Sequence, residues 1–251
     1  MTKITVLRKD LVKFLSFTKG IPDLRIECAG TRITTEVAYA WYYLKKSMNV
    51  LPSEIEEDGT IHIANLDKFN QFLKASKSEF ITIRQIATTK PLHVIGGANK
   101  YQIPSTDEIE SASKVPAIRN LLAEGWETGW ERMGNTEFDA HGTVDATDLT
   151  SLADMRTLVS KESSFRLRIH AGESEFGLVA GKAINGRLFT TLPITNAIGP
   201  NATVQSSFGE WLWGCLQYLD EEDVRVHMAN NSLAVFEQPN TLLMVVDLAE
   251  E

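Results

Sequence analysis

The feature that most constrains the fold is a helix-forming stretch that runs directly into a strand-forming stretch at residues 65–84. Asn65 can cap this helix, because its side-chain oxygen can accept a hydrogen bond from an amide of the first turn. Apolar residues then recur at helical spacing, at Leu66, Phe69, Phe72 and Leu73. From Phe80 to Arg84 the period changes to two, which indicates a strand. The stretch predicts a short amphipathic helix with lysines on its polar face, followed by a strand.

The same arrangement of a helix followed by a strand occurs four times along the chain. The expected helices begin at Asp10, Asn65, Asp148 and Ser207, with Asp10 and Ser207 as N-caps, and the strands that follow contain residues 24–26, 81–83, 167–169 and 224–226. One such match is common by chance, but four in order indicate an internal duplication. Since each helix accompanies several strands, we expect an α+β fold in which helices pack on one side of antiparallel sheets.

Residues 105–135 differ from the rest of the chain. Their first part is polar and acidic, residues 116–124 can form a short helix, and residues 125–130 are irregular and aromatic. A stretch of this kind between two similar halves is typical of a connector. The sequence therefore predicts two similar domains, at residues 1–104 and 136–251, joined by this connector.

Composition indicates a soluble protein that acts inside the cell, and we expect it to be cytoplasmic. The chain has 251 residues and 43% hydrophobic content, enough for a substantial core. Its apolar runs, such as residues 241–246, are too short to span a bilayer, and the N-terminus lacks the apolar segment of a signal peptide. Cys28 and Cys215 each lie in an apolar context, so we expect buried free thiols rather than a disulfide or a metal site.

The net charge of −8 argues against a general nucleic-acid binder, because such proteins are usually basic. It does not exclude a protein whose basic residues gather on one face while the remaining surface is acidic. The positions of the lysines are therefore more informative than the total charge.

The order of these elements resembles that of the DNA sliding clamps, in particular proliferating cell nuclear antigen and the T4-type phage clamps. The resemblance covers nearly the whole chain. It depends on the duplicated helix–strand unit, the acidic connector after residues 101–104, the segment 176–191 and the C-terminal strand that ends at residues 246–251. It implies a clamp fold with two similar domains per chain, and three chains in a homotrimeric ring. Helices would line the hole around duplex DNA, and sheets would form the outside.

The resemblance also implies which residues contact DNA. A sliding ring should bind phosphates, which carry no sequence information, and lysines on a helix face can do this. The expected residues are Lys13, Lys19, Lys68, Lys74, Lys77, Arg156 and Lys161. The alternative is that these residues form only the solvated side of amphipathic helices. The helix expected from Ser207 to Leu219 has no Lys or Arg, so the second half would line the hole with little positive charge.

Two further surfaces follow from the resemblance. A groove for partner peptides, under the connector and beside the C-terminal strand, would involve Ile118, Leu121, Leu122, Leu233, Val246 and Leu248. The alternative is that these are ordinary core residues. Subunit contacts would pair an edge strand of one chain with an edge strand of the next, through Lys100, Tyr101, Gln102 and Ile103 on one side and Leu188, Phe189, Thr190 and Thr191 on the other. The alternative there is a monomer with protected edges.

Catalysis receives little support from the sequence. Five histidines are scattered without metal-ligand spacing, and there is no nucleophile elbow or phosphate-binding glycine loop. The resemblance implies a processivity factor, and we expect it to be non-enzymatic, without metal or cofactor. Its partners would be duplex DNA, a DNA polymerase, an ATP-driven clamp loader and further copies of the chain, with no membrane. The alternatives are a clamp-like scaffold or oligomeric structural protein without DNA function, and then a hydrolase with a site between the halves.

Overall fold

The computed structural model describes residues 1–18, 20–39, 41–51, 54–106, 108–158, 165–180, 188–209, 211–219 and 222–247. The chain divides into two compact units. Unit 1 comprises Met1–Tyr39 and Lys45–Val115, and unit 2 comprises Ala40–Leu44 and Pro116–Glu251. Each unit combines helices with antiparallel sheets, so the α+β prediction is confirmed.

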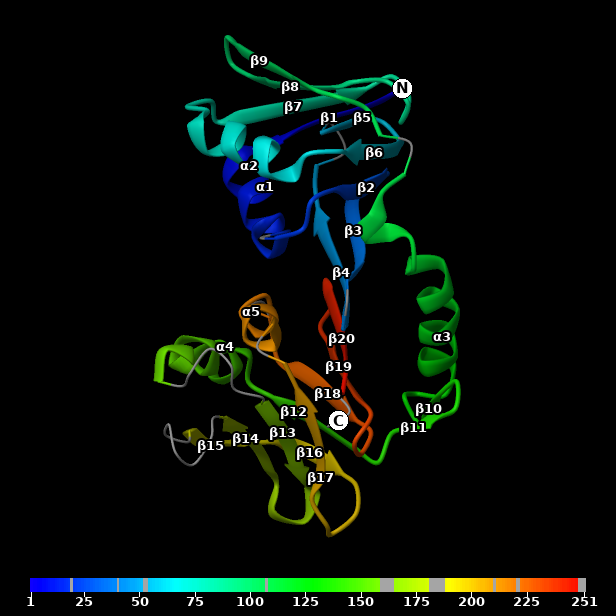
Figure 1. The fold of residues 1–251 in the computed structure, drawn as a ribbon, viewed down its shortest axis with the longest axis vertical. Coiled ribbons are helices and arrows are strands. Elements are labelled where there is room, and N and C mark those ends of the chain that lie inside the picture. The colour runs from blue at the N-terminus through cyan, green and yellow to red at the C-terminus, as the bar shows by residue number, and fades with distance from the viewer. Residues whose placement is uncertain are drawn as a thin grey trace. The chain divides into compact units, whose positions relative to one another are not determined.

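Unit 1 is built from two helices flanked by strands (Figure 1). Its elements are β1 (Thr2–Leu7), α1 (Arg8–Phe14), a 3-10 turn (Ser16–Thr18), β2 (Leu24–Ala29), β3 (Arg32–Tyr39), β4 (Tyr42–Asn49), which continues from unit 2, β5 (Ile55–Glu57), β6 (Gly59–Ile63), α2 (Leu66–Ala75), β7 (Phe80–Gln85), β8 (Leu92–Gly96), β9 (Asn99–Ile103) and a 3-10 turn (Glu110–Ala112). One sheet has the order β5-β1-β7-β8-β9, and β2 pairs with β3 and β6 in another.

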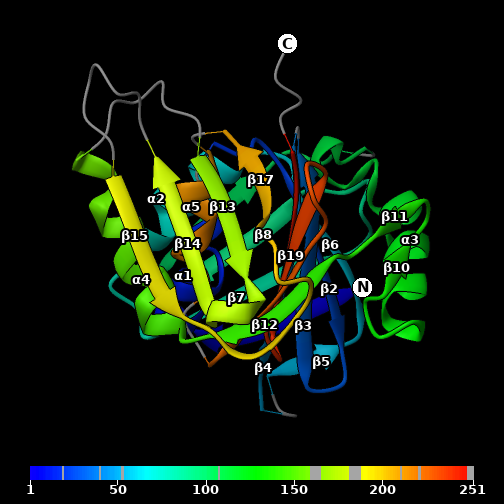
Figure 2. The same ribbon diagram turned by 90° about the horizontal axis from the view of Figure 1, so that it is seen from below.

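Unit 2 repeats this plan after a longer helix. Its elements are α3 (Val115–Glu127), β10 (Arg132–Met133), β11 (Thr136–Glu137), β12 (Ala140–Val144), α4 (Ala146–Asp154), a 3-10 turn (Met155–Leu158), β13 (Phe165–His170), a 3-10 turn (Ala171–Glu173), β14 (Glu175–Ala180), β15 (Leu188–Pro193), β16 (Thr195–Ile198), β17 (Val204–Phe208), α5 (Trp211–Leu216), β18 (Val224–Met228), β19 (Leu233–Glu237) and β20 (Thr241–Val246). The strand orders are β15-β14-β13-β17 and β16-β12-β18-β19-β20. Figure 2 shows β15, β14 and β13 side by side, with α4 and α5 on one side of this sheet.

The strand pairing confirms the internal duplication. In unit 1 the strand before α1 pairs with the strand after α2 (β1 with β7), and the strand after α1 pairs with the strand before α2 (β2 with β6). Unit 2 follows the same rule around α4 and α5, with β12 paired to β18 and β13 paired to β17. Each of the four helices leads into the strand that the sequence predicts.

The stretch at residues 65–84 folds as its sequence predicts. Asn65 Oδ1 accepts a hydrogen bond from the Lys68 amide at 3.0 Å, which caps α2. Leu66, Phe69 and Leu73 are buried, while Phe72 is half-buried and stacks on Tyr101 with ring centroids 5.9 Å apart. The helical spacing of the apolar residues therefore fixes which face of α2 points into the core.

Three predicted helix starts are wrong. Helix α1 begins at Arg8, not at Asp10, because the Arg8 amide donates to Glu79 O at the end of the β1–β7 ladder. Helix α4 is capped by Asp145, whose carboxylate accepts a hydrogen bond from the Thr147 amide at 2.7 Å. This bond lowers the pKa of Asp145. Asp148 therefore lies inside the helix. Ser207 lies in β17, paired with Arg166, because residues 204–208 alternate as a strand and that pattern outweighs the capping preference of one serine.

The prediction of buried free thiols is confirmed. Cys28 and Cys215 are both free and buried. Among the residues that the structure describes, no helix has the length and apolar character needed to cross a membrane.

Candidate functional site

Four of the expected DNA-binding residues lie on or beside the two helices of unit 1. Lys13 is on α1, Lys68 and Lys74 are on α2, and Lys77 follows α2 directly. All four are exposed, because the opposite faces of both helices are buried through residues such as Leu11. The helices contact each other, as the blue and cyan coils of Figure 1 show, so these lysines belong to one helical layer. Lys19 lies outside the described residues.

Two further basic residues lie in the same layer but were not among the residues predicted from the sequence. Lys9 is exposed on α1, and its spacing of four residues from Lys13 puts both on one helix face. Arg8 is half-buried, and its Nε donates to Ser78 O at 3.1 Å, which ties the start of α1 to the segment after α2. The four-residue spacing of Lys9 and Lys13 can be seen in the sequence, whereas the contact of Arg8 with Ser78 can be seen only in the folded structure. We refer to Lys9, Lys13, Lys68, Lys74 and Lys77 as the lysine layer.

Helices α4 and α5 of unit 2 carry no corresponding charge. Neither Ala146–Asp154 nor Trp211–Leu216 contains Lys or Arg, and the exposed residues of α4 include Thr147 and Ser151. Arg156 is in the 3-10 turn after α4, and Lys161 lies outside the described residues. The positive charge of the described helical layers is therefore concentrated in unit 1.

The residues expected to form a partner-peptide groove divide into two groups. Leu122 and Leu233 are buried in the core of unit 2, and Ile118 is half-buried. Leu121 and Val246 are exposed, at 41% and 38%. Leu248 lies outside the described residues.

Two exposed tryptophans also belong to the surface of unit 2. Trp41 accepts a backbone hydrogen bond from the Val246 amide at 3.0 Å, so the two residues are neighbours. Trp126, on α3, donates its indole N–H to Glu237 Oε1 at 3.2 Å. Both side chains are nearly half exposed, so they present apolar surface to solvent.

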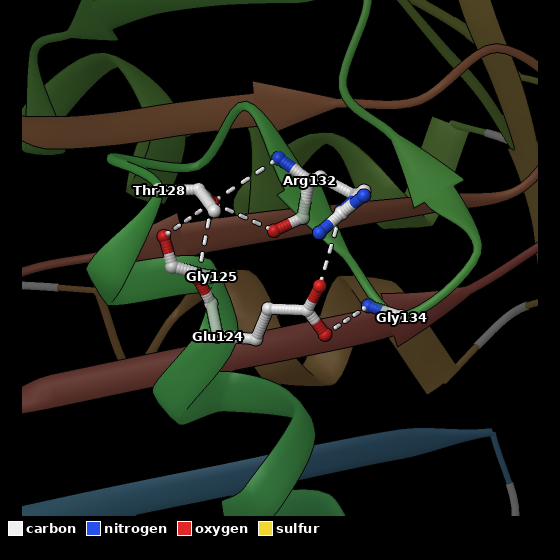
Figure 3. A network of polar contacts seen from close by, with 5 residues as sticks. All are labelled: Glu124, Gly125, Thr128, Arg132 and Gly134. Carbon is white, nitrogen blue, oxygen red and sulfur yellow. Dashed lines mark hydrogen bonds and ion pairs between the residues drawn. The ribbon is translucent and has the colours of Figure 1, made fainter.

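A polar network fixes the end of α3 (Figure 3). Glu124 accepts from Arg132 Nε at 3.0 Å and from the Gly134 amide at 2.9 Å. Thr128 Oγ1 donates to Arg132 O at 2.8 Å and can accept from the Arg132 amide. These bonds connect α3 to the β10–β11 hairpin, so residues 115–137 form an ordered segment where the sequence predicted only a short helix and an irregular stretch.

The strands expected at the subunit contacts both lie at sheet edges. Within the part of the chain that the structure describes, β9 ends one strand order of unit 1 and β15 ends one of unit 2. On β9, Lys100 and Gln102 are exposed, Tyr101 is half-buried and Ile103 is buried. On β15, Phe189 is 62% exposed, Thr191 is exposed, and Leu188 and Thr190 are half-buried. A large apolar side chain on an unpaired edge strand is typical of a surface that another chain covers.

A metal centre has no support in the described part of the chain, where no group of three or more His, Cys, Asp or Glu side chains could hold an ion. A polar pocket of about 470 Å³ lies on unit 2, lined by Thr143, Asn196, Glu222, Asp223, Arg225, Glu237, Gln238 and Pro239. Glu237 of this pocket lies 3.8 Å from His227. His227 in turn contacts His141, although the two histidines are far apart in the sequence.

Comparison with solved structures gives the fold class of the whole chain, which is that of the DNA sliding clamps. The Helicobacter pylori beta clamp bound to a DNA ligase peptide matches with a TM-score of 0.70 and 13% identity, over 99% of this chain and 67% of the clamp. A putative DNA polymerase III beta subunit from Eubacterium rectale matches with a TM-score of 0.71 and 11% identity, over 99% and 66%. The Bacillus subtilis DNA polymerase sliding clamp matches with a TM-score of 0.69 and 12% identity, over 100% and 65%.

The chain thus has the sliding-clamp fold and spans about two thirds of the length of these bacterial clamps. No protein-family model matches the sequence, and the comparison with curated proteins gives no match.

Proposed function

We propose that this protein is a DNA sliding clamp that encircles duplex DNA and tethers a DNA polymerase. The observation that carries the proposal is the lysine layer on a chain with the clamp fold and a net charge of −8. A chain with this charge binds DNA only where its basic residues are concentrated. Exposed lysines on two adjacent helices can contact phosphates without reading sequence, which is what a sliding ring requires.

The ring would contain three chains, as in the two-domain clamps of the proliferating cell nuclear antigen and T4 type. A chain two thirds the length of the bacterial clamps needs more copies to complete a ring of similar size, and six domains require three chains with two domains each. We place these domains at residues 1–104 and 136–251, with 105–135 as the connector. β9 of one chain would pair with β15 of the next, and Phe189 would be covered by this contact.

Partner proteins would dock through short peptides on unit 2. Leu121 and Val246 offer exposed apolar side chains there, and Trp41 and Trp126 add aromatic surface. The H. pylori clamp in the comparison is bound to a DNA ligase peptide, so a clamp of this fold can bind peptides. An ATP-driven loader would open the ring, and the protein itself would act inside the cell without catalysis or a cofactor.

The competing function is a clamp-like scaffold that does not bind DNA. The absence of Lys and Arg from α4 and α5 favours it, because half of the helical layer then lacks the charge that a DNA-binding ring uses.

Mass and topology measurements separate the two functions. Light scattering should give about 84 kDa, three chains of 28.0 kDa each. Without a loader, a closed ring should thread onto linear duplex with free ends and bind closed circular DNA of the same sequence far more weakly. A stable 28.0 kDa monomer at high concentration would refute the ring. A trimer that binds neither DNA would identify the scaffold, and equal binding to both would indicate an ordinary surface binder.

A further inference from the structure

Two histidines face each other across neighbouring strands of unit 2. His141 on β12 and His227 on β18 are directly paired in the antiparallel ladder. Their Nδ1 atoms are 2.9 Å apart, which is hydrogen-bonding distance. His227 is only 7% exposed, so its ring is held by protein groups rather than by water.

The segment after α3 covers this pair. Trp130 stacks on the His227 ring with centroids 5.2 Å apart, and Phe138 lies edge-on to both Trp130 and His227. A Cβ atom at Gly125 would lie 2.7 Å from the Trp130 ring, so glycine at this position allows the indole to reach its place. Backbone hydrogen bonds also hold the segment. Two lie within it, from Trp130 N–H to Gly125 O and from Phe138 N–H to Glu131 O, and one joins it to β18, from Asp139 N–H to Met228 O.

Charged groups lie near the pair on the neighbouring strands and on the covering segment. Glu237 Oε2 on β19 is 3.8 Å from His227 Nε2, and Arg225 on β18 lies 3.9 Å from the same carboxylate. The His227 ring and the Trp126 indole N–H hold the pKa of Glu237 below its usual value. Glu131 and Asp139, on the covering segment, raise the pKa of His141, whereas its burial lowers that pKa. Glu237 therefore remains a carboxylate beside His227 Nε2, at a distance too long for a hydrogen bond, while His227 Nδ1 faces His141.

The short distance between the rings limits how many protons the pair can hold. A hydrogen bond between two Nδ1 atoms needs one hydrogen, and a second would place two N–H groups against each other at 2.9 Å. Burial, and then the neighbouring His227, lower the pKa of His141, so the covered state keeps this ring neutral at a pH where a free histidine is protonated. Acid should therefore favour a state in which the rings have separated.

We propose that His141 and His227 form a proton-sensitive latch that holds residues 125–139 on the sheet of unit 2 and releases them in mild acid. The latch works on the segment that runs from the last turn of α3 to the start of β12, and it does not depend on whether the protein binds DNA. The sign follows from linkage: the latch contributes its full stability above the pH at which a free histidine titrates and loses it as the pH falls.

Hydrogen exchange on the wild-type chain tests the latch. The amides of Trp130, Phe138 and Asp139 report opening of the segment, and that of Leu178 in the β13–β14 ladder reports the rest of unit 2. If only the open state takes up the proton, opening should increase by up to about 30-fold between pH 7.5 and 5.0, after correction for intrinsic exchange, because pH 5.0 lies about 1.5 units below the usual histidine pKa. A change of less than about twofold relative to Leu178 would overturn the proposal.

A substitution assigns the effect to the pair. His141→Asn retains a polar group near the Nδ1 position without titrating, so its exchange should no longer depend on pH in this way. His170→Asn, a histidine change elsewhere in unit 2, should behave as the wild type. Unchanged pH dependence in His141→Asn would overturn the proposal. If that variant does not fold, nitrogen-detected NMR of the wild type decides, because neither ring protonated at Nδ1 at pH 7.5 would equally contradict the latch.

Discussion

The salt dependence of DNA binding gives the sharpest test of the lysine layer. Changing Lys68, Lys74 and Lys77 together to Gln removes three of its five charges in each chain and moves the net charge from −8 to −11. Each phosphate contact by a lysine contributes about −0.9 to the slope of log K against log salt. If the five lysines contribute equally, the slope of the variant should fall to about two fifths of the wild-type slope, whatever fraction of them touches phosphate at one time.

The assay is fluorescence anisotropy on a linear duplex over a range of KCl concentrations. A matched variant, Arg84→Gln with Lys90→Gln and Lys114→Gln, makes the same charge change at exposed positions of unit 1 outside α1 and α2. Its slope should stay near that of the wild type, because the total charge acts only through weak, screened long-range attraction. An equal loss of slope in both variants, or an unchanged slope in the first, would refute the assignment of DNA binding to the lysine layer.

Three further outcomes can be checked on the same protein. Phe189→Glu places a charge on the edge of β15 and should give a 28.0 kDa monomer in light scattering in place of the proposed trimer, whereas the same change at exposed Ile86 should not. A trimeric Phe189→Glu would remove β15 from the proposed interface. Glu124→Ala removes the acceptor for Arg132 and for the Gly134 amide. It should lower the free energy of unfolding, measured in urea, by about 1 kcal/mol, because the surface exposure of Arg132 limits the loss. No change would show that the network in Figure 3 adds no stability. Burial raises the pKa of Cys28 and Cys215 to about 12. At pH 8 the thiolate fraction of each is then about 10⁻⁴, whereas that of a free cysteine is roughly one quarter. Alkylation of the folded chain should therefore be far slower than that of the unfolded chain.

Periodicity was enough to predict most of the fold. The stripe of Leu66, Phe69 and Leu73 identifies the buried face of α2, and alternation identifies strands such as β1 and β18. These signals are reliable because burial imposes a period of 3.6 on a helix and of two on a strand. Repetition of the same order four times predicts an internal duplication, and the order of the elements resembles that of the sliding clamps, although no single segment is diagnostic.

Features that depend on pairing between distant segments could not be read in the same way. Arg8 and Ser207 lie where they do because β1 and β17 are held by partner strands, and local capping preferences do not contain that information. The contact of His141 with His227 joins residues 86 positions apart and depends on the register of β12 against β18. Charge spacing could have identified Lys9, since it lies four residues before Lys13.

Strands of the two repeats of each unit pair with each other, and this limits how such a chain can change in length. Because β1 pairs with β7 and β2 with β6, each repeat completes a sheet begun by the other, and neither has a full set of partners alone. Removing one repeat would leave unpaired edges along both sheets and an uncovered helix face. A chain with this architecture can therefore lose a whole unit more easily than a single repeat. If the proposed ring needs a fixed number of units, the number of chains and the number of units per chain vary inversely.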